Sequence, residues 1–172
     1  MWSILKSPLL ASADLDLVSS WAADPSAPEK GSGPELIEIL KNAEVLAVSD
    51  DPLGNEGVRL EDLPGDDAKS SPDVFVGKMQ GGKFAVVLLN RGNGPTNMTL
   101  ALTDLSKVAP PPPAGGGRVV AAGYDTYYMT AKQFAVRDLW AHSENGTVSA
   151  NGSITALVGR EDVVMLTLTP AA

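Results

Sequence analysis

The acidic side chains are the groups in this sequence that could do acid–base or nucleophilic chemistry. Two pairs of aspartates are adjacent, Asp50-Asp51 and Asp66-Asp67, and Asp14 follows an apolar stretch. Because neighbouring side chains point in different directions, we expect Asp50-Asp51 to end a helix rather than form a paired-carboxylate site. Asp66-Asp67 lies in a polar loop and is predicted to be a solvated charge pair. Asp14 could lie at the C-terminal end of a strand and take part in chemistry there, but the favoured role is a helix N-cap.

The single histidine and a group of aromatic residues offer two other kinds of site. His142 has no second histidine or cysteine near it, because the chain contains one histidine and no cysteine, so we expect no metal site. Trp140 could form a sugar-stacking platform with Tyr124, Tyr127 and Tyr128. Packing in a core, or against a barrel, is the more frequent fate of such aromatic residues.

Three N-x-[ST] motifs are possible N-glycosylation sites, at Asn97, Asn145 and Asn151. Asn97 is expected on the polar face of a strand, and the other two asparagines are expected in turns. All three would then be exposed, which supports a secretory or lysosomal parent protein.

Size and charge narrow the class of protein. The chain has 172 residues, 44% of them hydrophobic, which suits one globular domain, or one domain and a fragment, and is far from disorder. The net charge of −8 argues against a nucleic-acid surface. No apolar run approaches the roughly 20 residues of a membrane span. Residues 1–14 are no convincing signal peptide, because Lys6 interrupts the apolar region and no basic residue precedes it.

The run FAVVLL at residues 84–89 predicts the central strand of a β-sandwich. Side chains alternate along a strand, so Phe84, Val86 and Leu88 share one face and Ala85, Val87 and Leu89 share the other. An antiparallel sheet open to water would alternate apolar and polar residues. The outer face of this strand is therefore predicted to pack against something else.

The rest of residues 58–172 has the pattern of a mainly β, antiparallel sandwich. Gly81-Gly82 is placed for a tight hairpin, and the run of prolines and glycines at 109–117 predicts a loop. Residues 124–134 are ambiguous, and their aromatics suggest a further strand. The predicted strands are 73–79, 83–91, 97–103, 136–140, 153–158 and 163–169.

Residues 1–57 have a different pattern. We predict a helix end at 1–6, a short buried strand at 9–13, a polar loop at 22–33 and a helix that begins at Pro34. Asn42 can end that helix or cap a second short one. A strand and a helix without a strand partner cannot bury their faces alone. We therefore expect residues 1–57 to be poorly satisfied, with backbone hydrogen-bond donors and acceptors left unpaired. The helical stripe is predicted to comprise Leu36, Ile39, Leu40 and Ala43.

Five stretches carry a resemblance to a known family: MWSILKSPLLASADL, NAEVLAVSDDPLGNEG, PDVFVGKMQGGKFAVVLLNRG, VRDLWAH and VVMLTLTP. In this order they resemble the α-galactosidases of glycoside hydrolase family 27. There they correspond to the penultimate helix and last strand of a barrel, the helix that leads into the C-terminal domain, and the strands of a sandwich. The match breaks at 22–33 and 109–134, which look like insertions. The family often has a cysteine where this chain has Ala13.

The resemblance implies the end of a retaining hydrolase of terminal α-galactosides. Such enzymes need two carboxyl groups about 5–5.5 Å apart, and in this family both are aspartates on earlier strands of a (β/α)₈ barrel. That barrel needs about 250 residues. Residues 1–57 would be its remnant, the last strand and helix, and 58–172 the sandwich. No residue inherits a catalytic, cofactor, metal or sugar-binding role, so the isolated chain is predicted to be inactive.

The expected partner is the missing barrel portion, and a galactoside would be met only through that barrel. The parent enzyme is expected to be secreted, lysosomal or vacuolar. One alternative is a stand-alone noncatalytic β-sandwich that binds carbohydrate or a partner protein. A second alternative is an unrelated extracellular interaction domain, which failure of 9–13 to form a strand would favour. A genomic sequence upstream of Met1 that encodes the barrel in frame would favour the α-galactosidase fragment over both alternatives.

Overall fold

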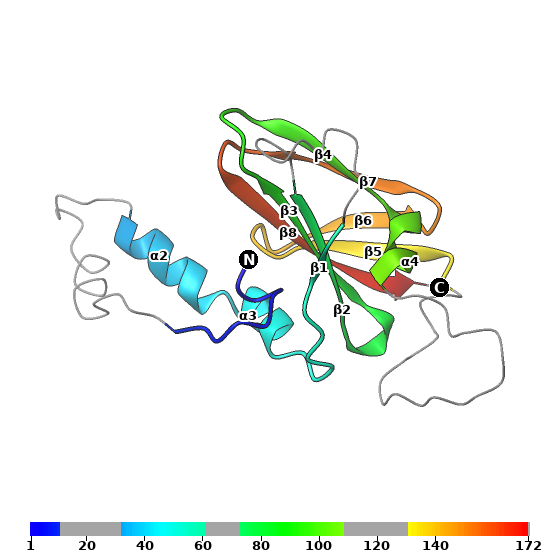
Figure 1. The fold of residues 1–172 in the computed structure, drawn as a ribbon, viewed down its shortest axis with the longest axis horizontal. Helices are drawn as coiled ribbons and strands as arrows, with labels where there is room; N and C mark the ends of the chain where they lie inside the picture. The colour runs from blue at the N-terminus through cyan, green and yellow to red at the C-terminus, as the bar shows by residue number, and fades with distance from the viewer. Residues whose placement is uncertain (11–31, 61–72, 109–130, 172) are drawn as a thin grey trace.

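The computed structural model describes residues 1–10, 32–60, 73–108 and 131–171, with the side chains of 32–36 excepted. It is a sandwich of two antiparallel sheets with two helices beside it (Figure 1). One sheet has six strands in the order β1-β2-β3-β8-β5-β6, and the other pairs β4 with β7. The strands are β1 (Val58–Arg59), β2 (Asp73–Lys78), β3 (Phe84–Asn90), β4 (Thr96–Ala101), β5 (Gln133–Asp138), β6 (Ser143–Ser149), β7 (Ser153–Val158) and β8 (Asp162–Ala171). The helices are α2 (Ser32–Lys41), α3 (Ala43–Ser49) and α4 (Leu105–Val108).

The predicted central strand is central in the structure. β3 lies between β2 and β8, with Val86 opposite Val76 on one side and Leu166 on the other. Phe84, Val86 and Leu88 point into the space between the sheets, and all three side chains are almost completely buried. The mainly β, antiparallel fold predicted from the sequence is therefore confirmed.

Alternating residues of both sheets fill the interior of the sandwich. From β4, Met98 and Leu100 face inward, as their spacing predicts, and Asn97 and Thr99 face solvent. Phe84 meets Phe134 edge to face, with ring centroids 6.1 Å apart and planes at 71°, a preferred aromatic geometry. The buried residues of this first core are Leu60, Val74, Val76, Phe84, Val86, Leu88, Met98, Leu100, Leu102, Leu105, Phe134, Val136, Ile154, Val158, Leu166 and Leu168.

The hairpin between β2 and β3 turns through two glycines, as predicted. Gly81 and Gly82 both have φ near +71°, a backbone conformation that glycine adopts at little cost. The strand predicted at 97–103 ends earlier, at Ala101, and continues as a 3-10 turn (Leu102–Asp104) into α4. The strand predicted at 136–140 instead spans Gln133–Asp138.

Strand β6 was not predicted from the sequence. Its seven residues are mostly exposed and polar, because it is the edge strand of its sheet, so the apolar alternation that marks a strand is missing. Asn145 lies in β6 rather than in a turn, which corrects the sequence-based prediction. Gly146 beside it has φ +80°, and the pairing of β5 with β6 shifts register here, as in a β-bulge.

The N-terminal residues differ most from the prediction. Residues 1–6 form a hydrogen-bonded turn, not a helix end: the Ile4 and Leu5 N–H groups both donate to the Met1 carbonyl at 3.2 Å. Leu9 and Leu10 are not in a strand, and the rest of the predicted strand 9–13 lies outside the described residues. The insertions predicted at 22–33 and 109–134, and the ambiguous segment 124–134, are described only at their ends.

Candidate functional site

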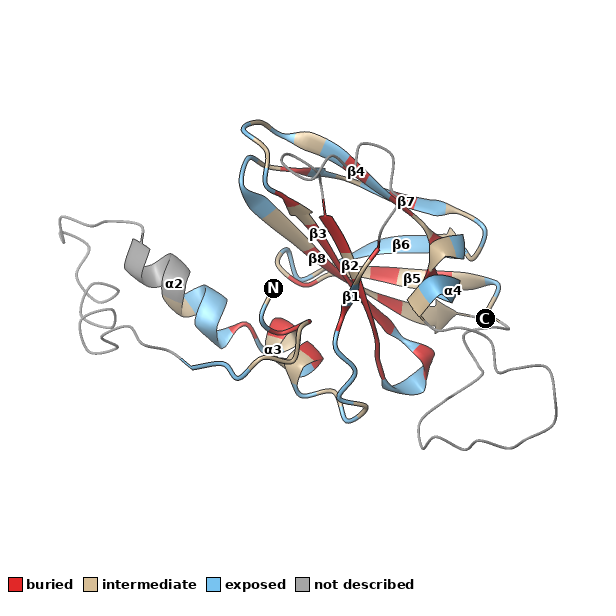
Figure 2. Cartoon of the chain, in the orientation of Figure 1, coloured by how far each residue is buried: buried red, intermediate tan, exposed pale blue. Residues whose placement is uncertain are grey.

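The outer face of β3 carries a second apolar core. Ala85 and Val87 are fully buried on it, and Leu89 packs at its edge. The cover predicted for this face comes in part from the chain's own N-terminal residues and α3 (Figures 1 and 2). The buried members of this second core are Ile4, Val45, Val48, Met79, Ala85, Val87, Leu139 and Met165.

Asn42 fastens the N-terminal end of α3. Its Oδ1 accepts hydrogen bonds from Glu44 N and Val45 N, both at 3.1 Å, which satisfies two donors that a helix start leaves open. Its Nδ2 donates to the Leu139 carbonyl at 2.8 Å. The sequence left open whether Asn42 ends the first helix or caps a second one. In the structure it does both, because it follows the last residue of α2 and caps α3.

An ion-pair cluster adds a second link at the same end. The Arg137 guanidinium on β5 donates to both Glu44 carboxylate oxygens, at 2.6 and 2.8 Å, and to Glu144 at 3.0 Å. His142 Nδ1 lies 2.7 Å from Glu44 Oε1. The hydrogen bonds from Arg137 and then His142 lower the pKa of Glu44 to about 2. The Glu44 carboxylate is therefore charged throughout the neutral and mildly acidic range.

The C-terminal end of α3 is held by two other charged residues. Lys6 Nζ donates to the carbonyl oxygens of Val48 and Ser49, where the helix leaves acceptors open. Burial lowers the pKa of Lys6, and the charges of Asp51 and Asp50 partly oppose this. The Asp51 carboxylate also accepts from Gln80 N at 3.0 Å, in the β2–β3 hairpin. Both ends of α3 are thus bonded to other elements.

Ile4 joins the first turn to the sheet through a close contact with glycine. The Gly57 N–H donates to the Ile4 carbonyl at 2.7 Å. A Cβ at Gly57 would lie 2.6 Å from Ile4 Cγ1, a distance that real Cβ atoms essentially never show. Glycine at position 57 therefore lets Ile4, which is 1% exposed, enter the second core.

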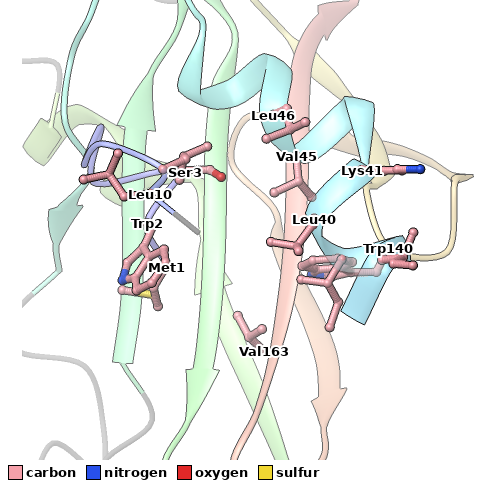
Figure 3. A pocket seen from close by; sticks show the side chains of 13 residues that line it. Met1, Trp2, Ser3, Leu10, Leu40, Lys41, Val45, Leu46, Trp140 and Val163 are labelled. Atoms are coloured by element: carbon pink, nitrogen blue, oxygen red, sulfur yellow. The ribbon is translucent and has the colours of Figure 1, made fainter. Parts of the chain in front are cut away.

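An apolar groove of about 700 Å³ opens between the first ten residues and helices α2 and α3. In Figure 3 Met1, Trp2 and Leu10 stand on one side, Leu40, Val45 and Leu46 on the other, and Val163 of β8 between them. Several wall side chains are exposed: Trp2 by 61%, Leu10 by 77% and Leu40 by 38%. In the described part of the chain, this wide apolar surface has no cover.

Trp140 is shared between this groove and a second hollow. Trp140 packs against the second core, and it also lines a neighbouring hollow of about 630 Å³ with Glu38, Lys41 and His142. The Trp140 indole N–H is buried and has no acceptor among the described residues. Trp140 thus packs against a core, which is the role that the sequence analysis favoured for it over sugar stacking. The three tyrosines of the alternative sugar platform lie outside the described residues.

The acidic pair at the end of α3 has the structural role that was predicted. Asp50 is the C-cap of α3: its N–H donates to the Leu46 carbonyl at 3.0 Å, and the Asp51 N–H donates to the Val48 carbonyl at 3.5 Å. The Asp51 carboxylate also binds the β2–β3 hairpin through Gln80 N. Asp14 and Asp66-Asp67 lie outside the described residues.

Other described acids also serve as structural ties. Asp73 pairs with Arg59 at 2.5 Å and with Arg91 at 2.6 Å. Asp138 accepts from Trp140 N and Ala141 N, both at 2.9 Å. Within the described ranges, no three His, Asp or Glu side chains gather as metal ligands would. These contacts position elements and show no reaction centre among the residues named.

Sequence reasoning missed the contacts that join α3 to the sandwich. Arg137 and Glu44 are 93 residues apart, and Asn42 and Leu139 are 97 apart. No spacing rule reaches over such distances. The available signals were local: Asn42 as a cap, and the apolar outer face of β3 that needs cover. Glu44 in the first turn of a helix is favoured by the helix dipole alone, so it gave no sign of a partner.

The three asparagines of the N-x-[ST] motifs are all exposed, as predicted. Asn97 lies on the solvent side of β4, and Asn151 lies in the turn between β6 and β7. Among the described helices, none has both the length and the apolar character that crossing a membrane requires.

Comparison with known proteins agrees with this architecture. A family model described as "Alpha galactosidase C-terminal beta sandwich domain" matches residues 69–168. The chain is 31% identical to an α-galactosidase of Coffea arabica over 170 residues, which are 99% of this chain and 34% of that protein. It is 28% identical to α-galactosidase 3 of Arabidopsis thaliana, covering 99% of this chain and 30% of that protein.

A solved structure extends the likeness to three dimensions. α-Galactosidase I from Mortierella vinacea superposes with a TM-score of 0.65 at 24% identity, covering 99% of this chain and 34% of that chain. The chain thus spans about a third of the length of the relatives it matches. With more than half of its residues matched by the family model, this chain belongs to the family of α-galactosidase C-terminal β-sandwich domains.

Proposed function

We propose that this chain is the C-terminal part of an α-galactosidase, in which the sandwich supports the catalytic barrel and is itself noncatalytic. The parent enzyme would hydrolyse terminal α-galactosyl residues of galactosides and glycoconjugates, the activity in the names of the relatives. Residues 1–57 would be the end of the barrel, and 58–172 the sandwich. The observation that carries the proposal is an apolar groove that the described residues leave uncovered, beside a helix that is firmly bonded to the sheet.

The apolar lining of the groove favours contact with a protein partner over contact with water. Trp2, Leu10 and Leu40 expose large apolar side chains along one wide depression, and contiguous apolar surface of this kind marks interaction sites. The buried Trp140 N–H lacks an acceptor among the described residues, and an unmade buried hydrogen bond costs about 1–3 kcal/mol. The barrel portion would supply both apolar cover and an acceptor.

The sandwich would act by holding the barrel's last helices in place. α3 is fixed to the sheet at both ends, by Asn42 and Glu44 at one and by Lys6 and Asp51 at the other. Since α2 precedes α3 by one residue, the sandwich also limits where α2 can lie. In this way a noncatalytic domain would position barrel elements without touching the substrate.

The parent enzyme would be secreted, lysosomal or vacuolar. The support comes from three N-x-[ST] motifs whose asparagines are all exposed. An enzyme made in the secretory pathway could carry glycans at these positions.

The experiment compares two proteins with a chromogenic α-galactoside. One is this chain alone, and the other is the product of the transcript extended upstream of the Met1 codon. We expect no hydrolysis by the chain alone and hydrolysis by the longer product if the reading frame encodes a barrel. Substantial hydrolysis by the chain alone, or an upstream frame with no barrel, would overturn the proposal. In the second case, sugar binding by the chain alone would favour a stand-alone module.

A further inference from the structure

The outer face of the two-stranded sheet is polar except at Leu157 and at the small, half-buried Ala101. Asn97 and Thr99 of β4 and Thr155 of β7 are exposed on it, and the two threonine hydroxyls lie 2.8 Å apart. Leu157 of β7 is 65% exposed. The described residues include seven large hydrophobic side chains exposed in this way, and five of them line the groove: Trp2, Leu9, Leu10, Ile39 and Leu40. Leu157 is not among those five, so the groove's partner would not account for it.

Leu157 lies directly opposite a glycosylation motif. In the β4–β7 ladder Asn97 is the Cα partner of Leu157, and Met98, which is buried, is the partner of Ala156. Asn97 and Leu157 therefore point to the same solvent face. Side chains at directly opposed positions have Cβ atoms about 4.5–5.5 Å apart. A group attached to the Asn97 amide would start within reach of the leucine.

We propose that Asn97 carries an N-linked glycan whose first sugar lies over Leu157. This inference rests on the secretory location in the proposed function. In the transfer, Asn97 Nδ2 attacks C1 of the first sugar of a polyprenyl-diphosphate-linked oligosaccharide. The C1–O bond to the diphosphate breaks, the N–C1 bond forms, and the amide loses one proton. The C–H face of a pyranose ring then removes apolar leucine surface from water.

The other two motifs have different surroundings. Asn145 lies at the register shift of the edge strand β6, beside Gly146, and has no direct Cα partner in β5. Asn151 lies in the turn before β7 and has no strand partner. Neither asparagine faces an exposed large apolar side chain through strand pairing. They are therefore matched controls, since a glycan lost from either should leave apolar exposure unchanged.

The test uses the full chain secreted from a eukaryotic host behind a cleavable signal peptide. Glycopeptide mass spectrometry is expected to find Asn97 occupied, and occupancy is expected to persist in Thr99→Ser but not in Thr99→Val. Light scattering is expected to show more self-association for Asn97→Gln than for Asn145→Gln or Asn151→Gln. Adding Leu157→Thr to Asn97→Gln is expected to restore the wild-type value.

The possible outcomes separate this inference from the proposed function. An unoccupied Asn97 in the folded, secreted chain overturns the glycan whatever the activity of the longer product. An occupied Asn97 with no effect of Leu157→Thr in the Asn97→Gln background overturns the contact with Leu157. Absence of hydrolysis by the longer product, with Asn97 occupied and the leucine effect present, counts against the α-galactosidase proposal and leaves the glycan supported.

Discussion

Helices α2 and α3 are separated only by Asn42, yet they have opposite relations to the sandwich. In α3, Val45 and Val48 are buried in the second core. In α2, Ile39 is 52% exposed and Leu40 38% exposed. The contrast is visible in Figure 2, where the C-terminal part of α2 is exposed and α3 contains buried residues. The sandwich therefore buries apolar side chains of α3, whereas those at the C-terminal end of α2 stay exposed among the described residues.

The difference shows that burial here follows hydrogen-bonded attachment as well as apolar pattern. α3 has a buried cap, an ion-pair cluster and a carboxylate bond to the β2–β3 hairpin. The expectation that residues 1–57 are poorly satisfied is wrong for α3 and for the first turn. It was based on a lone strand, whereas these segments bond to the sheet through side chains and through the Gly57–Ile4 pair. For α2 the expectation agrees with the exposure of Ile39 and Leu40.

A charge placed in each helix should give the largest difference between them. Val48→Asp puts a carboxylate at a position that is 2% exposed, and burial of an unpaired charge should lower the free energy of unfolding by about 3 kcal/mol or more. Ile39→Asp, at a position that is 52% exposed, should change it by less than about 0.5 kcal/mol. Urea denaturation of both variants measures this. Equal losses would mean that α2 is as buried in solution as α3.

The sequence predicted the sandwich well because its signals are local. FAVVLL at β3, the Gly81-Gly82 turn and the alternation around Met98 each depend on neighbours a few residues away, and each was confirmed. The requirement that the outer face of β3 be covered was also correct, since it follows from strand geometry alone. The edge strand β6 was missed because solvent on its exposed sides removes the apolar pattern.

The candidate site was harder to predict because it depends on long-range contacts. The Asn42 side chain was expected to cap a helix, but its bond to the Leu139 carbonyl depends on where β5 ends in space. The role of Arg137 likewise requires α3 to lie beside β5. The groove could not be foreseen, because residues 1–6 were expected to be a helix end and form a turn instead.

The cap of α3 gives the next largest expected effect. Asn42→Ala removes two bonds to helix N–H groups and one to the Leu139 carbonyl, so it should lower the free energy of unfolding by about 2 kcal/mol. Asn42→Asp keeps the acceptor for α3 but lacks the donor for Leu139, and its loss should be intermediate. Thermal unfolding measures both. If Asn42→Asp matched the wild type, the link to Leu139 would contribute nothing.

The contact between Gly57 and Ile4 should give an effect of similar size, and part of it should be reversible. Gly57→Ala adds a Cβ where Ile4 now lies, and overpacking of this kind costs about 1–3 kcal/mol. In the Gly57→Ala background, Ile4→Ala should cost less than it does alone, because the added methyl occupies part of the space that isoleucine leaves. A double-mutant cycle in urea tests this. Strict additivity of the two losses would show that the side chains do not meet.

The ion-pair cluster of α3 should give the smallest effect, which is best detected through its dependence on pH. Arg137 and then His142 hold the pKa of Glu44 at about 2, below its ordinary value of 4.5. A carboxyl group with a lowered pKa in the folded state stabilises the fold above its unfolded pKa, and loses that contribution as pH falls toward the folded value. The stability gap between wild type and Glu44→Gln should shrink as the pH falls from 4.5 to 2.

The same pH series compares the two helices directly. Glu38 of α2 is exposed, so it serves as the matched control: Glu38→Gln should change the stability less than Glu44→Gln does. Chemical denaturation from pH 7 to 2.5 gives each curve, and added salt should reduce the Glu44 gap because exposed ion pairs are screened. A gap for Glu44→Gln that stayed constant down to pH 2.5 would mean that the carboxylate does not depend on Arg137 in solution. The attachment of α3 would then rest on Asn42 and the apolar contacts alone.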